Sequence, residues 1–185
     1  MEKENQRVVL SKRMLKEGLL RCLKRTDIDE LTISELCREA GINRATFYRY
    51  YQLPKDVLVD IGWEQTREID KIFKSNPEQP MENRISDVFR YIYDNRDTLK
   101  ILFSANADNR FASVVTNIFP WAWTSTIDLK KKYSLDDDEY RLCVAAYSWS
   151  SYHLIREWII NDIKKTPEEI TDLFIRINRP DLYTK

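Results

Sequence analysis

Apolar residues recur every three or four positions along most of the chain, which is the spacing of one buried face of an α-helix. The first such stripe consists of Leu15, Leu19, Cys22 and Leu23. No run of alternating apolar and polar residues bounded by turn residues indicates a strand, and only 3 Gly and 6 Pro are available for turns. The pattern therefore predicts an all-α fold.

Caps and helix breakers predict where the helices begin and end. The first helix starts near Val8, the second and third cover 33–40 and 44–51, and Pro54 opens the fourth. Two prolines within 75–80 mark a linker, because proline cannot continue a helix. Beyond the linker we expect helices near 81–95, 97–105, 110–131, 135–162 and 167–178, with Ser134 and Thr166 as the starts of the last two and about nine helices in total.

The second and third helices are marked by strong local signals. Thr32 and Glu35 have the spacing of a capping box, Gly41 suits the left-handed residue that ends a helix, and Asn43 is a good N-cap. Small Ala40 allows close helix packing. Two short helices joined by a tight turn make a helix-turn-helix, whose second helix enters the major groove of DNA.

The second helix of this motif has one apolar anchor, Phe47, and an outward face. Arginine can bond guanine through two hydrogen bonds, and the methyl groups of Ala45 and Thr46 suit the thymine methyl. The hydroxyls of Tyr48 and Tyr50 can reach phosphate. The outward residues are predicted to be Asn43, Arg44, Ala45, Thr46, Tyr48 and Arg49. The alternative for this pattern alone is a helical hairpin inside any α-bundle.

Residues 31–51, LTISELCREAGINRATFYRYY, resemble the DNA-binding core of the tetracycline-repressor (TetR) family, and the likeness extends over about residues 8–62. The resemblance implies a two-fold symmetric, all-helical dimer that binds a double-stranded DNA operator. It also implies an N-terminal helix-turn-helix domain, here 1–55, and a helical effector-binding and dimerisation domain, here 56–185. An inducer or partner on the larger domain would then change the separation of the two DNA-binding domains.

The family's functional positions can be placed on this chain through the same motif. Arg44, Ala45 and Thr46 match the base-facing positions, and Tyr48 and Tyr50 match positions that contact phosphate. Thr32 and Ser34 match the start of the supporting helix. The chain departs from the family at Pro54, where a phosphate-binding lysine is expected; Lys55, one position later, is the candidate to replace it.

The C-terminal part is rich in aromatic residues, which can form an ordinary core, a ligand cavity, or both. If a cavity is present, we expect it to involve Phe89, Tyr93, Phe103, Phe119, Trp123 and Tyr147. The helix near 135–162 is apolar on more than one face, as in a helix buried on both sides. We expect this helix and the one near 167–178 to form a homodimer interface about a two-fold axis.

Composition and charge add little to this picture. The net charge is zero, and residues 1–60 carry 12 Lys and Arg against 10 Asp and Glu. Three cysteines without a CxxC pair suggest reduced thiols, and no segment has the pattern of a signal peptide or a membrane span, so we expect a soluble cytoplasmic protein.

No motif in the sequence favours an enzyme. His153, the only histidine, is interpreted as a core or interface residue, and the acidic run 136–139 as the start of a helix. No cofactor, catalytic residue or metal ligand is predicted. The prediction is a TetR-like regulator controlled by a ligand. The alternatives are a regulator without a small-molecule pocket, whose C-terminal domain docks a partner protein, and a helical adaptor that never touches DNA.

Overall fold

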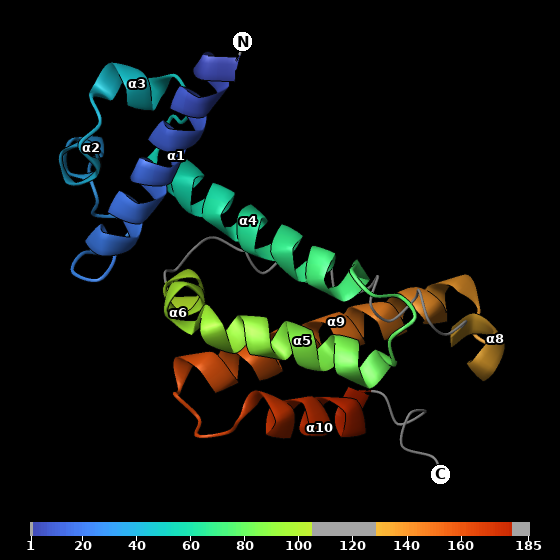
Figure 1. The fold of residues 1–185 in the computed structure, drawn as a ribbon. Helices are drawn as coiled ribbons and strands as arrows, with labels where there is room; N and C mark the ends of the chain where they lie inside the picture. The colour runs from blue at the N-terminus through green and yellow to red at the C-terminus, as the bar shows by residue number, and fades with distance from the viewer. Residues whose placement is uncertain (1, 105–128, 179–185) are drawn as a thin grey trace. The chain divides into compact units, whose positions relative to one another are not determined.

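The computed structural model describes residues 2–104 and 129–178, and these residues form helices and connecting loops without a strand (Figure 1). The predicted all-α fold is confirmed. The helix expected near 110–131 lies almost entirely outside the described residues, as do the cavity candidates Phe119 and Trp123. The chain divides into two compact units, and the division falls within α4 and again within α6.

The N-terminal unit holds α1 (Glu2–Cys22), α2 (Ile33–Ala40), α3 (Arg44–Tyr48) and the part of α4 (Pro54–Lys74) up to Glu64. Figure 1 shows α2 and α3 on one side of α1. α1 begins at Glu2, before the predicted start near Val8. Of the stripe predicted for this helix, Leu15, Leu19 and Cys22 are buried, and Leu23 is half-buried and follows the helix. Side chains with no exposed surface come from all four helices: Leu15, Leu19, Leu36, Phe47 and Val57.

α1 and α2 touch at two small residues. A Cβ atom on Gly18 would lie 2.8 Å from the Cβ atom of Ala40 and 3.0 Å from its Cα atom, closer than such atoms approach. Gly18 is therefore needed for this helix contact. Ala40 contributes by its small size, which the sequence had indicated, but its partner on α1 could not be identified from spacing.

The local signals around α2 and α3 are confirmed. The Thr32 hydroxyl accepts a hydrogen bond from the Glu35 amide at 3.2 Å, and the Glu35 carboxylate accepts one from the Thr32 amide at 3.0 Å. Gly41 has φ +66° and closes α2. The Asn43 side-chain oxygen accepts a hydrogen bond from the Thr46 amide at 2.8 Å. α3 ends at Tyr48, three residues before the predicted end, because the chain turns there toward α4.

The C-terminal unit holds the rest of α4, α5 (Met81–Asp94), α6 (Arg96–Ser104) up to Lys100, α8 (Leu129–Tyr133), α9 (Asp137–Ile160) and α10 (Pro167–Asn178). α10 packs against α5 and α9. The Phe89 ring centre lies 5.2 Å from that of Phe174 and 5.9 Å from that of Trp158, so one aromatic cluster joins these three helices.

Buried Arg84 closes the C-terminal end of α4. Its Nε donates a hydrogen bond to the Phe73 carbonyl oxygen at 2.8 Å, and its guanidinium lies 4.2 Å from the centre of the Phe73 ring. A cation near a helix C-terminus is favourable because the last carbonyls carry partial negative charge. Arg84, near the start of α5, thus connects the helix after the linker to the helix before it.

The predicted start of the helix near 135 is wrong. α9 begins at Asp137, and its N-cap is Asp136, whose side chain accepts hydrogen bonds from the Asp138 and Glu139 amides. Ser134 instead has φ +54° and lies in the turn after α8. A carboxylate with a glutamate three residues later outcompeted the serine as cap. The other predicted start is confirmed: Thr166 and Glu169 exchange hydrogen bonds at the beginning of α10.

Candidate nucleic-acid interface

α3 is a short helix anchored by one side chain. Phe47 is fully buried, and its ring centre lies 5.7 Å from that of Tyr48 and 6.1 Å from that of Tyr51. The other side of the helix is open. Of the predicted outward residues, Asn43, Arg44, Ala45, Tyr48 and Arg49 are exposed and Thr46 is half-buried; Tyr50, a predicted phosphate contact, is also half-buried.

The charges on this face are uncompensated. Neither Arg44 nor Arg49 lies within ion-pair distance of a carboxylate among the described residues. Other arginines of the same unit differ: Arg21 and Arg25 bind the Glu39 carboxylate at 2.7 and 2.8 Å, and these hydrogen bonds lower the pKa of Glu39. Arg44 and Arg49 are therefore available to an anionic partner.

Two further predicted contacts, Thr32 and Ser34, lie at the start of α2. The Thr32 hydroxyl also donates a hydrogen bond to the Glu35 carboxylate at 2.6 Å, so it is committed to the capping box, which lowers the pKa of Glu35. Ser34 is half-buried, and its hydroxyl makes no hydrogen bond within the described part of the chain. Of the two, Ser34 has the hydroxyl that is available to an incoming phosphate.

The segment before α4 is organised by Asp56. Its carboxylate accepts hydrogen bonds from the Gln52 and Leu53 amides, both at 2.8 Å, and so caps the helix that Pro54 begins. Lys55, the candidate phosphate contact, forms an ion pair with Asp29 in the loop before α2. A phosphate at Lys55 would have to compete with this carboxylate.

A buried polar network holds the end of the motif in place. Tyr51 is 6% exposed, and its hydroxyl donates a hydrogen bond to Asp60 of α4 at 2.6 Å. The Lys16 ammonium of α1 lies 3.2 Å from the same carboxylate and 3.0 Å from that of Glu64. Two helices of the unit, α1 and α4, and the segment after α3 therefore meet at one carboxylate.

The network shifts the titration of both partners. Burial alone would raise the pKa of Asp60, but the hydrogen bond from Tyr51 and the charge of Lys16 outweigh it and hold the pKa below its ordinary value. Burial, together with the hydrogen bond to Asp60, raises the pKa of Tyr51. Sequence reasoning missed this network, because an i, i+9 pair across a turn has no periodic signal.

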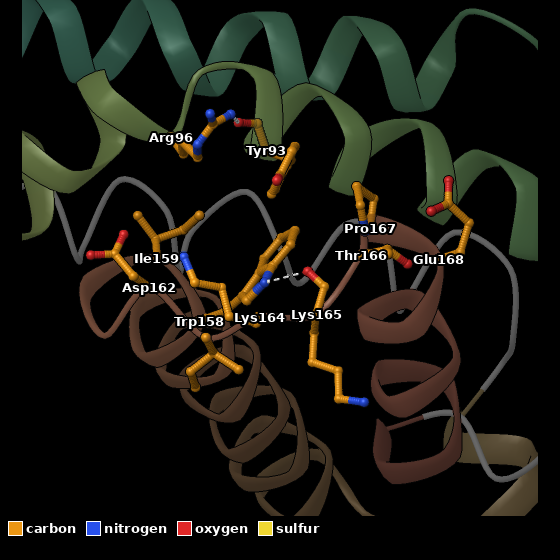
Figure 2. A pocket seen from close by; sticks show the side chains of 11 residues that line it. Tyr93, Arg96, Trp158, Ile159, Asp162, Lys164, Lys165, Thr166, Pro167 and Glu168 are labelled. Atoms are coloured by element: carbon orange, nitrogen blue, oxygen red, sulfur yellow. Dashed lines mark hydrogen bonds between the residues drawn. The ribbon is translucent and has the colours of Figure 1, made fainter.

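The aromatic residues considered for a ligand cavity do not gather around one described cavity. Phe89 and Phe103 are buried, and Tyr147 is half-buried. Tyr93, 38% exposed, does line a cavity of about 450 Å³, together with Trp158 and the loop between α9 and α10 (Figure 2). Trp158 was not among the candidates, since its spacing indicated only core.

The two helices considered for dimerisation keep large apolar side chains at the surface. Leu142 is 72% and Trp149 45% exposed on α9, and Ile177 is 54% exposed on α10. Within the described residues no cluster of metal-binding side chains occurs. None of the described helices has the length and apolar character needed to cross a membrane.

Comparisons with known proteins agree on one family. A family model described as "Bacterial regulatory proteins, tetR family" matches residues 17–60, and one described as "Transcriptional regulator C-terminal region" matches residues 79–179. No curated protein matches the chain.

Solved structures share the fold at low sequence identity. A TetR transcriptional regulator from Streptococcus agalactiae is 14% identical with a TM-score of 0.71, over 95% of this chain and 97% of that one. A TetR-family regulator from Syntrophomonas wolfei is 14% identical with a TM-score of 0.70, over 100% and 97%. The dihydroxyacetone kinase operon activator DhaS is 15% identical with a TM-score of 0.63, over 95% and 97%. With a helix-turn-helix at its N-terminus and family models matching both parts of the chain, the protein belongs to the TetR family of DNA-binding transcriptional regulators, which are not enzymes.

Proposed function

We propose that this regulator binds a palindromic operator as a homodimer, in the cytoplasm, and that a ligand on its C-terminal domain controls the binding. The observation that carries the DNA half of the proposal is the exposed face of α3, where Arg44 and Arg49 have no carboxylate partner among the described residues. A pair of exposed guanidinium groups on a rigidly anchored helix suits the edges and phosphates of the major groove.

The exposed side chains divide by chemistry into base-reading and phosphate-binding groups. Arg44 would bond guanine, and the methyl groups of Ala45 and Thr46 would contact thymine. The remaining positions would bind phosphate or the groove edge: Thr32, Ser34, Asn43, Tyr48, Arg49, Tyr50 and Lys55. Among these, Thr32 and Lys55 would bind phosphate only by leaving Glu35 and Asp29, so their contributions should be the smallest.

The dimer would form through α9 and α10. A soluble monomer rarely leaves several large apolar side chains exposed along two neighbouring helices. Leu142, Trp149 and Ile177 would be covered by the same helices of a second copy about a two-fold axis, which matches the symmetry of a palindrome.

Residues 1–55 would bind DNA, and residues 56–185 would bind the effector and form the dimer. α4 serves both parts, since Val57 and Ile61 are buried in the core of the N-terminal unit.

The second candidate is a regulator whose C-terminal domain docks another protein. The same exposed Leu142 and Trp149 favour it, because that surface would also suit a different apolar partner.

Selection of bound sequences from a random DNA pool tests the proposal with the full chain. We expect an enriched palindrome, with half-sites spaced by about one helical turn of DNA or a multiple of it. Arg67→Ala, an exposed arginine of α4, is the matched control and should enrich the same sequence as the wild type. Enrichment of a single, non-repeated half-site would contradict the homodimer, and no enrichment would contradict sequence-specific binding.

A further inference from the structure

The cavity of the C-terminal unit lies where α5, α6, the end of α9 and the start of α10 converge. Its floor is apolar: Trp158 and Ile159 are 3% and 4% exposed, while Ile163 at the rim is 45% exposed. A volume of about 450 Å³ falls within the usual range of small-molecule pockets. The space is therefore large enough for a small organic molecule that places an apolar body on this floor.

An ordered aromatic stack forms one wall. The Tyr93 ring lies against the Trp158 indole, with ring centres 5.8 Å apart and planes 21° from parallel, and the Arg96 guanidinium lies 4.5 Å from the centre of the Tyr93 ring. Trp158 Nε1 donates a hydrogen bond to the Lys165 carbonyl oxygen at 3.1 Å, which fixes the indole (Figure 2). The wall is thus preorganised.

The charged groups of the lining are unequally paired. Both acidic groups have partners outside the cavity lining: Asp162 binds Lys100, and Glu168 binds Arg90 at 3.0 Å. Lys165 binds Glu169 at 2.6 Å. The two remaining cations, Arg96 and Lys164, have no carboxylate within ion-pair distance among the described residues.

Arg96 and Lys164 act on the same side of the cavity. Both lower the pKa of Asp162, although the hydrogen bond from Lys100 is the main cause, so both positive charges lie near that carboxylate. Arg96 donates one hydrogen bond to the Tyr93 carbonyl oxygen, at 2.9 Å, and its guanidinium has further N–H donors. Figure 2 shows the Lys164 amine on the side of Arg96 and Asp162, while the Lys165 side chain points away. Three cations around one carboxylate leave an excess of positive charge.

We propose that this cavity binds a small organic carboxylate with an apolar body, its carboxylate held by Arg96 and Lys164 and its body resting on Trp158, Ile159 and Ile163. The proposal rests on the ligand-controlled function above and names the chemical class of the ligand. An anion is favoured because it would satisfy two uncompensated cations through charge-assisted hydrogen bonds. A purely apolar ligand would leave both cations without a partner.

Calorimetric titration of the full chain without DNA tests this with three probes. Benzoate has both features, acetate lacks the apolar body, and benzamide lacks the charge. We expect saturable binding of benzoate, with acetate and benzamide each binding at least about threefold more weakly. Acetate would lose the contact of the buried ring, and benzamide would lose an exposed charge-assisted contact. Equal affinity for benzoate and benzamide, or no saturable binding of benzoate, would overturn the proposal.

Two variants assign the carboxylate contacts. Lys164→Gln and Arg96→Gln should each weaken benzoate about threefold or more and leave benzamide unchanged. Lys164 is the cleaner test, because Arg96→Gln would also remove the hydrogen bond to the Tyr93 carbonyl oxygen and the contact with the Tyr93 ring. Lys71→Gln, an exposed lysine of α4 paired with Glu68, is the matched control and should bind benzoate like the wild type. A benzoate affinity unchanged in both cavity variants, or reduced equally in the control, would refute the assignment. Selection of operator sequences with the same variants tests DNA binding separately from ligand binding.

Discussion

Single residues fix the geometry of the DNA-binding unit, and Tyr51 is the clearest case. Its ring packs against Phe47, the anchor of α3, and its hydroxyl reaches Asp60 on α4. Asp60 in turn is held by Lys16 of α1. The orientation of the recognition helix therefore depends on an aromatic contact and on one buried hydrogen bond that a phenylalanine would not make.

Removal of this hydroxyl tests the network. Tyr51→Phe should lower the free energy of unfolding by about 0.5–1.5 kcal/mol, because Asp60 loses a hydrogen-bond donor in a partly buried site. Urea denaturation measures the change. Tyr48→Phe is the control, since Tyr48 is 59% exposed, and should leave the stability unchanged. Equal stabilities of Tyr51→Phe and the wild type would show that the hydrogen bond contributes nothing.

The lowered pKa of Asp60 predicts how stability depends on pH. A carboxyl with a folded-state pKa below its unfolded value stabilises the fold above the unfolded pKa, and this contribution is lost as the pH falls through the folded pKa. The ordinary value is 3.8, so the loss lies below about that pH. Asp60→Asn should therefore be less stable than the wild type at pH 7, and the difference should narrow as the pH falls below 3.8. A difference that stays constant with pH would exclude ionised Asp60 as the source.

At this scale the sequence revealed the caps and the outward face of α3, because both depend on neighbours within four residues. The partners of Tyr51, Lys55 and Arg84 were not predictable. Each partner lies on another element or beyond a turn, and its identity depends on how the helices pack. The expected phosphate contact at Lys55 illustrates this, since Asp29, its ion-pair partner, is 26 positions away.

At the scale of elements, the contact of α1 with α2 depends on the absence of one side chain. A methyl group at position 18 would meet the Cβ and Cα atoms of Ala40, and both helices would have to shift. The same close approach places α2, and with it the turn at Gly41 that orients α3.

Gly18→Ala should destabilise the protein by about 1–3 kcal/mol through overpacking, even though alanine favours a helix by about 1 kcal/mol over glycine. Thermal or urea unfolding measures the effect. The double variant Gly18→Ala with Ala40→Gly restores space, so it should be more stable than the sum of the two single changes indicates. Additive effects would mean that the two positions do not touch.

Helix starts were predictable where one cap was dominant, as at Thr32 and Thr166. The start of α9 was misplaced because Ser134 and Asp136 are both good N-caps, and only the fold determines which residue takes the left-handed turn after α8. The end of α3 was predicted three residues too late for a related reason. The Asp56 carboxylate accepts hydrogen bonds from the Gln52 and Leu53 amides, so these residues lead into α4 and do not extend α3.

At the scale of the whole molecule, the proposed function requires two copies to read two half-sites. α9 carries two large exposed apolar side chains, Leu142 and Trp149, and Trp149 stacks with His153 at a distance of 6.0 Å between ring centres. The apolar pattern on more than one face of this helix predicted such a surface, but it cannot distinguish a second copy from another protein.

Trp149→Glu should convert the proposed dimer into a monomer, because a charge within an apolar interface would be buried without a partner. Sedimentation velocity measures the change. Trp63→Glu is the matched control, since Trp63 has the same 45% exposure but lies on α4, and it should remain dimeric. Two monomeric variants, or two dimeric ones, would argue against an interface at Trp149.

The exposed face of α3 is proposed to read DNA bases, and the affinity of Arg44→Ala for the selected operator measures this contribution. We expect a loss of about 1–3 kcal/mol on the full operator, together with relaxed preference at one base position of each half-site. Arg67→Ala should match the wild type. An Arg44→Ala variant that keeps the wild-type affinity and base preference would contradict the claim.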